Sequence, residues 1–202
     1  MATVGALLAE IDGTSDAMAI RRATVDVLST AQDRGRAAIR LGFEADPTRA
    51  RRVTKSYAHL TDRLVQCAWL VATRILHPCP NPTEGEHFAV LGVGGYGRGE
   101  MAPHSDVDLL FLTPWKVTPW VESVVESMLY ILWDLKLKVG HSTRTVKDCI
   151  RLGAEDFTIR TALLERRLIC GEQTLADTLQ KRLWEDLFRK TVADFIEAKL
   201  AE

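Results

Sequence analysis

The chain has 202 residues, enough for one domain with a sizeable core or for one domain with a helical extension. Its apolar content of 47% and charged content of 26% are ordinary for a globular protein, and its net charge of -1 offers no global field for nucleic acid or an anionic membrane. No window approaches about 18 uninterrupted apolar residues, and the N-terminus has no basic leader. We therefore expect a cytoplasmic protein with neither membrane nor nucleic acid as its partner.

Residues 1–80 are predicted to be a helical N-terminal region. Apolar residues recur at helical intervals over residues 15–46, and Pro47 lies near the end of that helix and the first turn of the next one. The second helix carries a group of basic side chains: Arg49, Arg51, Arg52 and Lys55. These side chains either form a solvated helix face or guide a phosphate-rich ligand.

The pattern changes after residues 77–86, which contain three prolines and a glycine. Short apolar runs of strand length follow at 87–93 and 106–112, then an amphipathic helix behind Pro119 and a third strand at 138–145. From residue 145 to the end the pattern is helical again, including residues 156–171. The predicted fold class is α+β, with a small mixed β-sheet surrounded by helices and with helical N- and C-terminal segments.

The segment "GVGGYGRGEMAPHSDVDLLFL", residues 92–112, combines a glycine loop with two aspartates. Its glycines match G-x-G-x-x-G, but Pro103 and the next strand follow too soon for the crossover helix that a dinucleotide-binding turn requires. The kinase glycine loop does not fit, since Gly99 stands where a valine belongs and no V-A-I-K or H-R-D follows. A P-loop is excluded because Gly-Lys-Ser/Thr is absent.

A third arrangement fits this segment: a strand, Gly-Gly, one short helical turn, and a strand bearing Asp-x-Asp. Gly94 and Gly95 have no side chains, so a triphosphate can approach their backbone N–H groups. Asp106 and Asp108 are two residues apart, so on a strand both side chains leave the same face. Two repelling aspartates on one face are unfavourable in an ordinary strand, and one or two Mg²⁺ ions held between them explain the pattern.

This segment resembles the signature of the DNA polymerase beta-like nucleotidyltransferase superfamily. More narrowly, it is similar to the N-terminal nucleotidyltransferase domain of the bacterial uridylyltransferases that modify the PII nitrogen-regulatory protein. The segments "LYILWDLKLKVGHSTRTVKDCI" and "TALLERRLICG" also match that family, so the resemblance is specific from about residue 88 to 171 and looser elsewhere.

The resemblance implies transfer of UMP from UTP to a tyrosine of the PII protein, with release of pyrophosphate. It makes Asp106 and Asp108 the catalytic Mg²⁺ ligands and places Gly94 and Gly95 against the phosphates. Arg98 would meet the β- or γ-phosphate, and Ser105 would either contact phosphate or cap a turn. Another nucleotide or acceptor, or an inactive nucleotide-binding fragment, is the alternative.

Two departures from the superfamily pattern matter. The strand at 138–145 lacks the third carboxylate that members of the superfamily usually supply, which leaves the general base open. His141 is either that base or a hydrogen-bonded structural residue, and Arg144 is a candidate phosphate contact. Glu165 is expected to be a surface charge on a helix.

The second departure concerns length. The resemblance implies a helical region at 1–80, a nucleotidyltransferase core at 81–150, and a C-terminal helical region at 151–202. Full-length members continue into a metal-dependent hydrolase and two glutamine-sensing domains, and none of the five histidines here is followed by Asp. We therefore expect the chain to be truncated before any hydrolase or regulatory domain.

Overall fold

The computed structural model describes residues 16–189, so the helical predictions at 1–15 and 190–202 lie outside the described residues. Its strands are β1 (Ala89–Gly92), β2 (Val107–Thr113), β3 (Val139–Thr145) and β4 (Arg167–Gly171). Its α-helices are α2 (Ala17–Ala45), α3 (Ala50–Val71), α4 (Gly94–Gly97), α5 (Pro119–Asp134), α6 (Val146–Glu155), α7 (Phe157–Leu164) and α8 (Gln173–Arg182). Short 3₁₀ or π segments extend or link them: η1 (Pro47–Arg49), η2 (Ala72–Leu76), η3 (Glu84–Glu86) and η4 (Leu183–Phe188).

The chain folds into two compact units whose segments alternate along the sequence. The helical unit comprises residues up to 81, 99–107 and 119–140. The sheet unit comprises residues 82–98, 108–118 and those from 141 onward.

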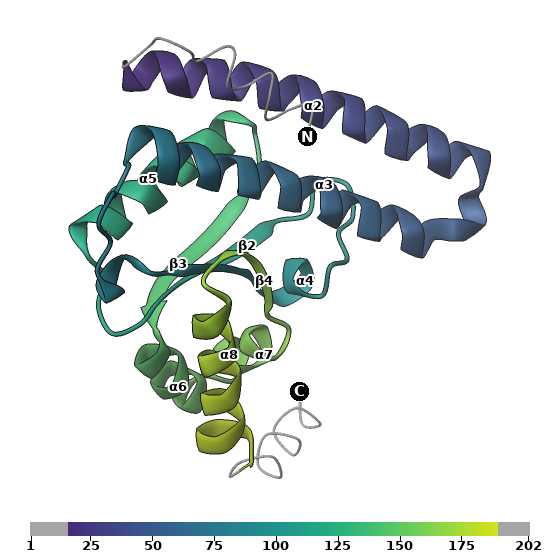
Figure 1. Ribbon diagram of the computed structural model, residues 1–202. Coiled ribbons are helices and arrows are strands. Elements are labelled where there is room, and N and C mark those ends of the chain that lie inside the picture. Colours follow the sequence, from purple (N-terminus) through teal and green to yellow (C-terminus); the bar gives the residue numbers. More distant parts are fainter. Residues whose placement is uncertain (1–15, 190–202) are drawn as a thin grey trace. The chain divides into compact units, whose positions relative to one another are not determined.

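Three helices make up most of the helical unit. Helices α2 and α3 run side by side in opposite directions, and α5 packs against both (Figure 1). Asp16 caps α2 by accepting a hydrogen bond from the Met18 amide at 3.1 Å. Apolar residues of α3 that face this packing are buried, including Leu64, Cys67 and Val71, whereas Leu70 is 42% exposed. Among the described residues, no helix is both long and apolar enough to cross a membrane.

The strands form one four-stranded sheet in the order β3-β2-β1-β4. Strand β1 is antiparallel to both neighbours. Strands β2 and β3 run the same way, because the Val107 amide donates to the Lys138 carbonyl at their beginnings and the Thr113 hydroxyl to the Arg144 carbonyl at their ends. The sheet is therefore mixed, and the predicted α+β fold class is confirmed.

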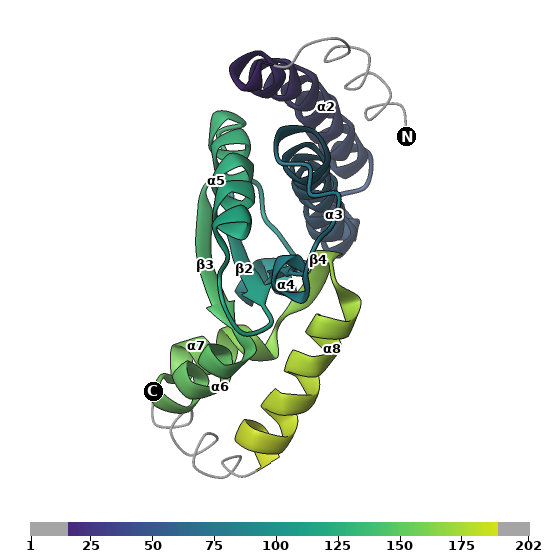
Figure 2. The ribbon, with the colours of Figure 1, turned by 60° about the vertical axis from the view of Figure 1, so that its left-hand side comes forward.

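The core of the sheet unit lies on one face of β1 and β2. Helices α6, α7 and α8 cover this face (Figure 2). Its members are apolar residues that are at most 8% exposed: Ala89, Leu91, Leu110, Leu112, Val146, Cys149, Leu163, Ala176, Leu179, Leu183, Leu187 and Phe188. Because successive strand residues point to opposite faces, Leu91 and Leu110, which pair across the two strands, enter this core together.

The prediction of an uninterrupted helix over residues 156–171 is wrong. Helix α7 ends at Leu164, and Arg167–Gly171 form the edge strand β4, which pairs with β1. The residues of β4 have no strong helix-breaking signal before Gly171, so local propensity could not reveal the pairing. Long-range hydrogen bonding to β1 decides the conformation here.

One ion pair in the sheet unit predicts a small pH dependence of stability. His87 Nδ1 lies 3.0 Å from Glu172 Oε1, and this hydrogen bond raises the pKa of His87 above its ordinary value of 6.5. The pair therefore contributes its full stabilisation below pH 6.5 and loses it as the pH rises through the raised pKa. Both side chains are more than 40% exposed, so we expect less than about 1 kcal/mol.

The measurement is the free energy of unfolding by urea at about pH 5.5 and about pH 8.5, for the wild type and Glu172→Gln. The wild type should lose slightly more stability over this range than the variant does. An equal loss in both proteins would show that the pair carries no stabilisation.

Candidate active site

The glycine loop folds as the predicted single helical turn. Strand β1 ends at Gly92, and α4 begins at Gly94, whose φ of +57° is a left-handed conformation that favours glycine. The Val93 amide donates to the Asp108 carbonyl at 3.0 Å, which joins the beginning of the turn to β2. The chain thus turns sharply at the end of β1, and this hydrogen bond joins the turn to β2.

The Asp108 side chain lies beside this turn. A Cβ atom placed on Gly94 would be 3.6 Å from Asp108 Oδ2, and one on Gly95 would be 3.6 Å from Arg98 Nη2. A carboxylate and a guanidinium therefore flank the two glycines, whose lack of side chains leaves the backbone open to an anion. The structure brings together four of the predicted site residues: Gly94, Gly95, Arg98 and Asp108.

Asp106 and Ser105 belong to the segment that leads into β2, within the helical unit. Asp106 directly precedes the strand and is exposed, Val107 is buried, and Asp108 is half-buried. This alternation is expected when the two aspartates leave the side of the chain opposite to Val107. The Ser105 hydroxyl accepts a hydrogen bond from the Ala102 amide at 3.0 Å, so the serine closes the turn before the strand.

The donor set suits a hard divalent cation. In the part of the chain that the structure describes, no group of three or more His, Cys, Asp or Glu side chains is arranged to hold a metal. One or two carboxylates are nevertheless a usual protein contribution to an Mg²⁺ site, where water and substrate phosphates supply the other ligands. Asp106 and Asp108 therefore fit Mg²⁺ better than a metal that needs a complete protein cage.

Two residues that sequence reasoning did not assign to the site support its turn. Glu165 is not a surface charge on a helix, as expected, but follows α7 and pairs with Arg98 at 2.5 Å. Arg167, on β4, donates to the Gly97 and Tyr96 carbonyls, each at 3.3 Å. Nothing in the sequence signals these contacts, because they depend on the undetected strand β4.

The third strand carries the remaining candidates. His141 is exposed on β3 and Arg144 is half-buried on the same strand. Arg144 is close enough to Asp156 to contribute to the lowered pKa of that carboxyl, after the larger effect of hydrogen bonds from the Ile159 and Thr158 amides. The general base therefore stays unassigned.

Comparison with known proteins agrees with this geometry. Residues 87–169 match the model of the nucleotidyltransferase domain family. The stretch from residue 87 to 169, which contains the glycine turn, is therefore similar to nucleotidyltransferase domains.

The relatives are similar to this chain over most of its length, and each is named as a bifunctional uridylyltransferase/uridylyl-removing enzyme. The protein of Ruegeria pomeroyi is 61% identical over 188 residues, or 93% of this chain and 21% of the relative. That of Cereibacter sphaeroides is 60% identical over 198 residues, or 97% of this chain and 21% of the relative. That of Azospirillum brasilense is 48% identical over 190 residues, or 94% of this chain and 20% of the relative.

These similarities confirm the family resemblance seen in the glycine loop. The chain spans about a fifth of the length of these curated relatives.

Proposed function

We propose that this chain carries the nucleotidyl-transfer site of a uridylyltransferase, which moves UMP from UTP to a tyrosine hydroxyl of the PII nitrogen-regulatory protein. The phenolic oxygen forms a bond to the α-phosphorus, the bond from that phosphorus to the bridging oxygen breaks, and pyrophosphate leaves. The observation that supports this proposal most is the position of the Asp108 carboxylate beside the Gly94 turn. The cytoplasm, which contains UTP, is the proposed setting.

The phosphates of UTP would lie against the backbone of Gly94 and Gly95. The Arg98 guanidinium, which flanks Gly95, would bind the β- or γ-phosphate. Glu165 pairs with Arg98 and would limit where that guanidinium can lie before the nucleotide arrives. Ser105 would keep the turn before Asp106 closed, and its hydroxyl is a further candidate contact to phosphate.

Asp106 and Asp108 would hold one or two Mg²⁺ ions. Bound there, Mg²⁺ would neutralise phosphate charge and favour ionisation of the attacking hydroxyl. The phenolic proton passes to water or to a base that we do not assign. The removal of UMP, which the names of the relatives mention, is not proposed for this stretch of chain.

The test is transfer of labelled UMP from UTP to purified PII protein, with Mg²⁺ and with EDTA, beside ATP, CTP and GTP. We expect labelling that requires the metal and is selective for UTP. Equal labelling from other nucleotides would support a nucleotidyltransferase of different specificity. UTP binding by calorimetry without any transfer would favour a nucleotide-binding fragment.

A further inference from the structure

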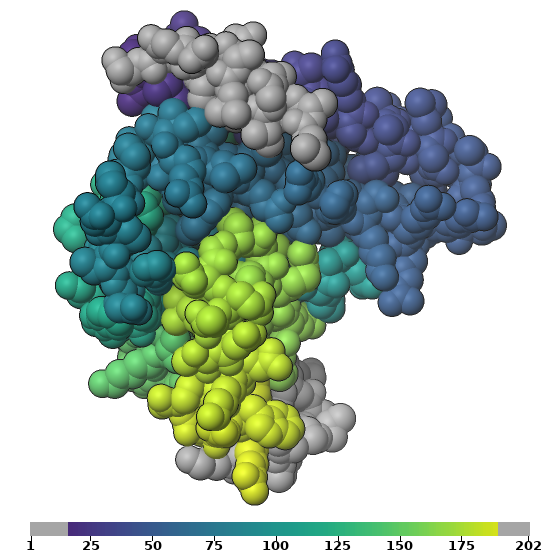
Figure 3. All heavy atoms as spheres, in the orientation of Figure 1, coloured from purple at the N-terminus to yellow at the C-terminus, as the bar shows by residue number. Residues whose placement is uncertain are grey.

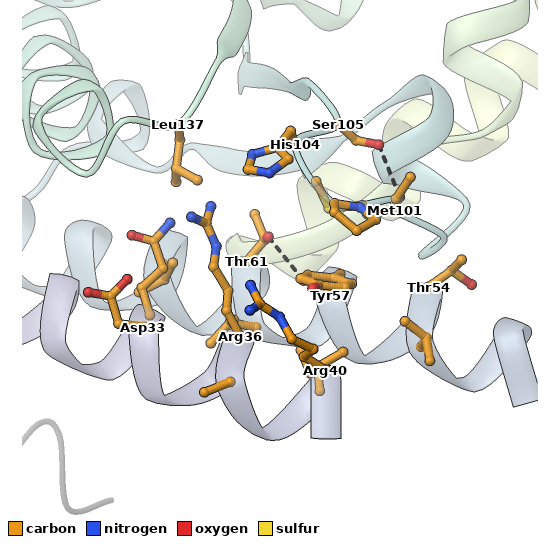
Figure 4. Close-up of a pocket in the computed structure, with 18 of the residues that line it drawn as sticks. Asp33, Arg36, Arg40, Thr54, Tyr57, Thr61, Met101, His104, Ser105 and Leu137 are labelled. Carbon is orange, nitrogen blue, oxygen red and sulfur yellow. Dashed lines mark hydrogen bonds between the residues drawn. The ribbon is translucent and has the colours of Figure 1, made fainter. Parts of the chain in front are cut away.

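A cavity of about 660 Å³ lies within the helical unit, between the second half of α2 and the first half of α3. We call it the α2–α3 cavity. The turn at residues 101–105 and residues 136–138, after α5, complete its wall (Figure 4). Its apolar lining includes Tyr57, Leu60, Leu64, Met101 and Leu137. The size is within the range typical of ligand-binding pockets.

The charged side chains of this cavity are predominantly cationic. Arg36, Arg40, Lys136 and Lys138 line it, with Asp33 as the acidic member. Arg36 and Arg40 extend from α2 into the space facing Tyr57 and His104 (Figure 4). Within residues 16–189, Arg40, Lys136 and Lys138 form no ion pair, so their charges are available to a ligand.

The basic character continues outside the cavity along the first turns of α3. Arg52 and Lys55, which the sequence offered as a solvated face or as a guide for an anion, are exposed there. Figure 3 shows the end of α2 and the beginning of α3 as an exposed projection in blue. An anionic partner would therefore meet positive charge both at the rim and inside, in a chain whose net charge is -1.

Backbone strain is also concentrated in this cavity. Among the described residues, the non-glycine residues with positive φ are His104 at +66° and Lys136 at +60°, and both line it. His104 follows Pro103 in a turn closed by the Ser105 amide on the Ala102 carbonyl, a position where glycine is preferred.

Lys136 occupies a similar position after α5. Its amide donates to the Trp133 carbonyl and the Leu137 amide to the Leu132 carbonyl, which is the helix-ending pattern that normally places glycine at the left-handed residue. Side chains kept at such positions are candidates for a functional role, because each costs roughly 1–2 kcal/mol of strain.

We propose that the α2–α3 cavity binds the acceptor: an acidic segment of the acceptor protein, with apolar side chains, that flanks the target tyrosine. This proposal rests on the proposed function. Residues 101–105 form part of the cavity wall, and Asp106 follows them directly in the sequence. The cavity wall is therefore continuous with a proposed residue of the transfer site. The apolar lining favours a peptide over nucleic acid, whose exposed backbone offers phosphate but few apolar groups.

The test is the kinetics of UMP transfer by Arg40→Glu, with Arg22→Glu as its matched control. Both arginines are exposed on α2, and they lie about 27 Å apart along the helix, beyond the reach of screened charge. We expect Arg40→Glu to lower kcat/KM for the acceptor about tenfold and to leave the KM for UTP unchanged. Arg22→Glu should change neither value by more than about twofold.

A second variant separates binding from folding. Lys136→Gly removes the strain and one cation, so we expect it to raise the melting temperature while it lowers kcat/KM for the acceptor. A raised KM for UTP in Arg40→Glu would show instead that the cavity holds the nucleotide. Unchanged kinetics in both cavity variants would overturn the proposal.

If the wild type transfers no UMP, the proposed function fails while acceptor binding can still be measured. Immobilised PII protein should then bind the wild type and Arg22→Glu, but bind Arg40→Glu about tenfold more weakly. Equal binding of all three proteins, or binding of none, would overturn the acceptor site. Displacement of the bound acceptor by an oligonucleotide at equal concentration would favour nucleic acid as the occupant.

Discussion

Replacing Asp108 with alanine is expected to reduce UMP transfer on the order of 10³-fold, because one of two proposed Mg²⁺ ligands is lost. The Asp108 carboxylate lies beside the Gly94 turn. Without it, the negative charge of a triphosphate bound at this turn would lack the Mg²⁺ ion that neutralises it. The measurement is the single-turnover rate with saturating UTP and acceptor.

Two further variants make this result specific. Asp108→Asn preserves the shape of the side chain and removes its charge, so it should lose nearly as much activity while its melting temperature stays close to that of the wild type. Asp177→Ala removes an exposed carboxylate on α8 that accepts a hydrogen bond from Gln173, and it should keep wild-type activity. Transfer by Asp108→Ala at the wild-type rate would refute the metal mechanism.

Replacing Gly97 with alanine is expected to destabilise the fold by about 3 kcal/mol or more. A Cβ atom there would lie 1.8 Å from the Glu165 carbonyl oxygen and 2.8 Å from the Gly92 carbonyl oxygen, and neither backbone atom can rotate away. We expect the melting temperature to fall by about 6–12 °C. Arg167, which donates to the Gly97 carbonyl, would lose its alignment in the same variant.

Gly42→Ala is the matched control for this substitution. Gly42 lies within α2, and a Cβ atom there would meet nothing within 4 Å. Alanine should therefore stabilise the helix by about 0.5–1 kcal/mol. A Gly97→Ala protein as stable as the wild type would mean that the Glu165 carbonyl, at the end of α7, does not approach the glycine turn as closely as the structure places it.

The sequence predicts the part of this site that is formed by residues close together in the sequence. Strand alternation, the Gly-Gly pair and the Asp-x-Asp spacing act within one continuous segment, so β1, α4 and β2 could all be anticipated. The partners of that segment are distant in the sequence. Glu165 and Arg167 reach the turn only because β4 pairs with β1, and residues 156–171 gave no local sign of a strand.

The α2–α3 cavity was also beyond sequence reasoning, for a different physical reason. Its four basic residues come from α2 and from the segment after α5, each of which looks like an ordinary solvated region by itself. The left-handed backbone at Lys136 carries no signal either, since lysine is an unusual residue at a position that favours glycine. Only the packing of α2 and α5 against α3 gathers these charges around one apolar space.

The most direct measurement of the central proposal is mass spectrometry of the PII protein after incubation with this chain, UTP and Mg²⁺. We predict one added UMP group on one tyrosine, absent when Asp108→Asn replaces the wild type or when EDTA is present. A PII protein that stays unmodified, although the chain is folded and binds UTP, would contradict the proposal that these residues form a working transfer site.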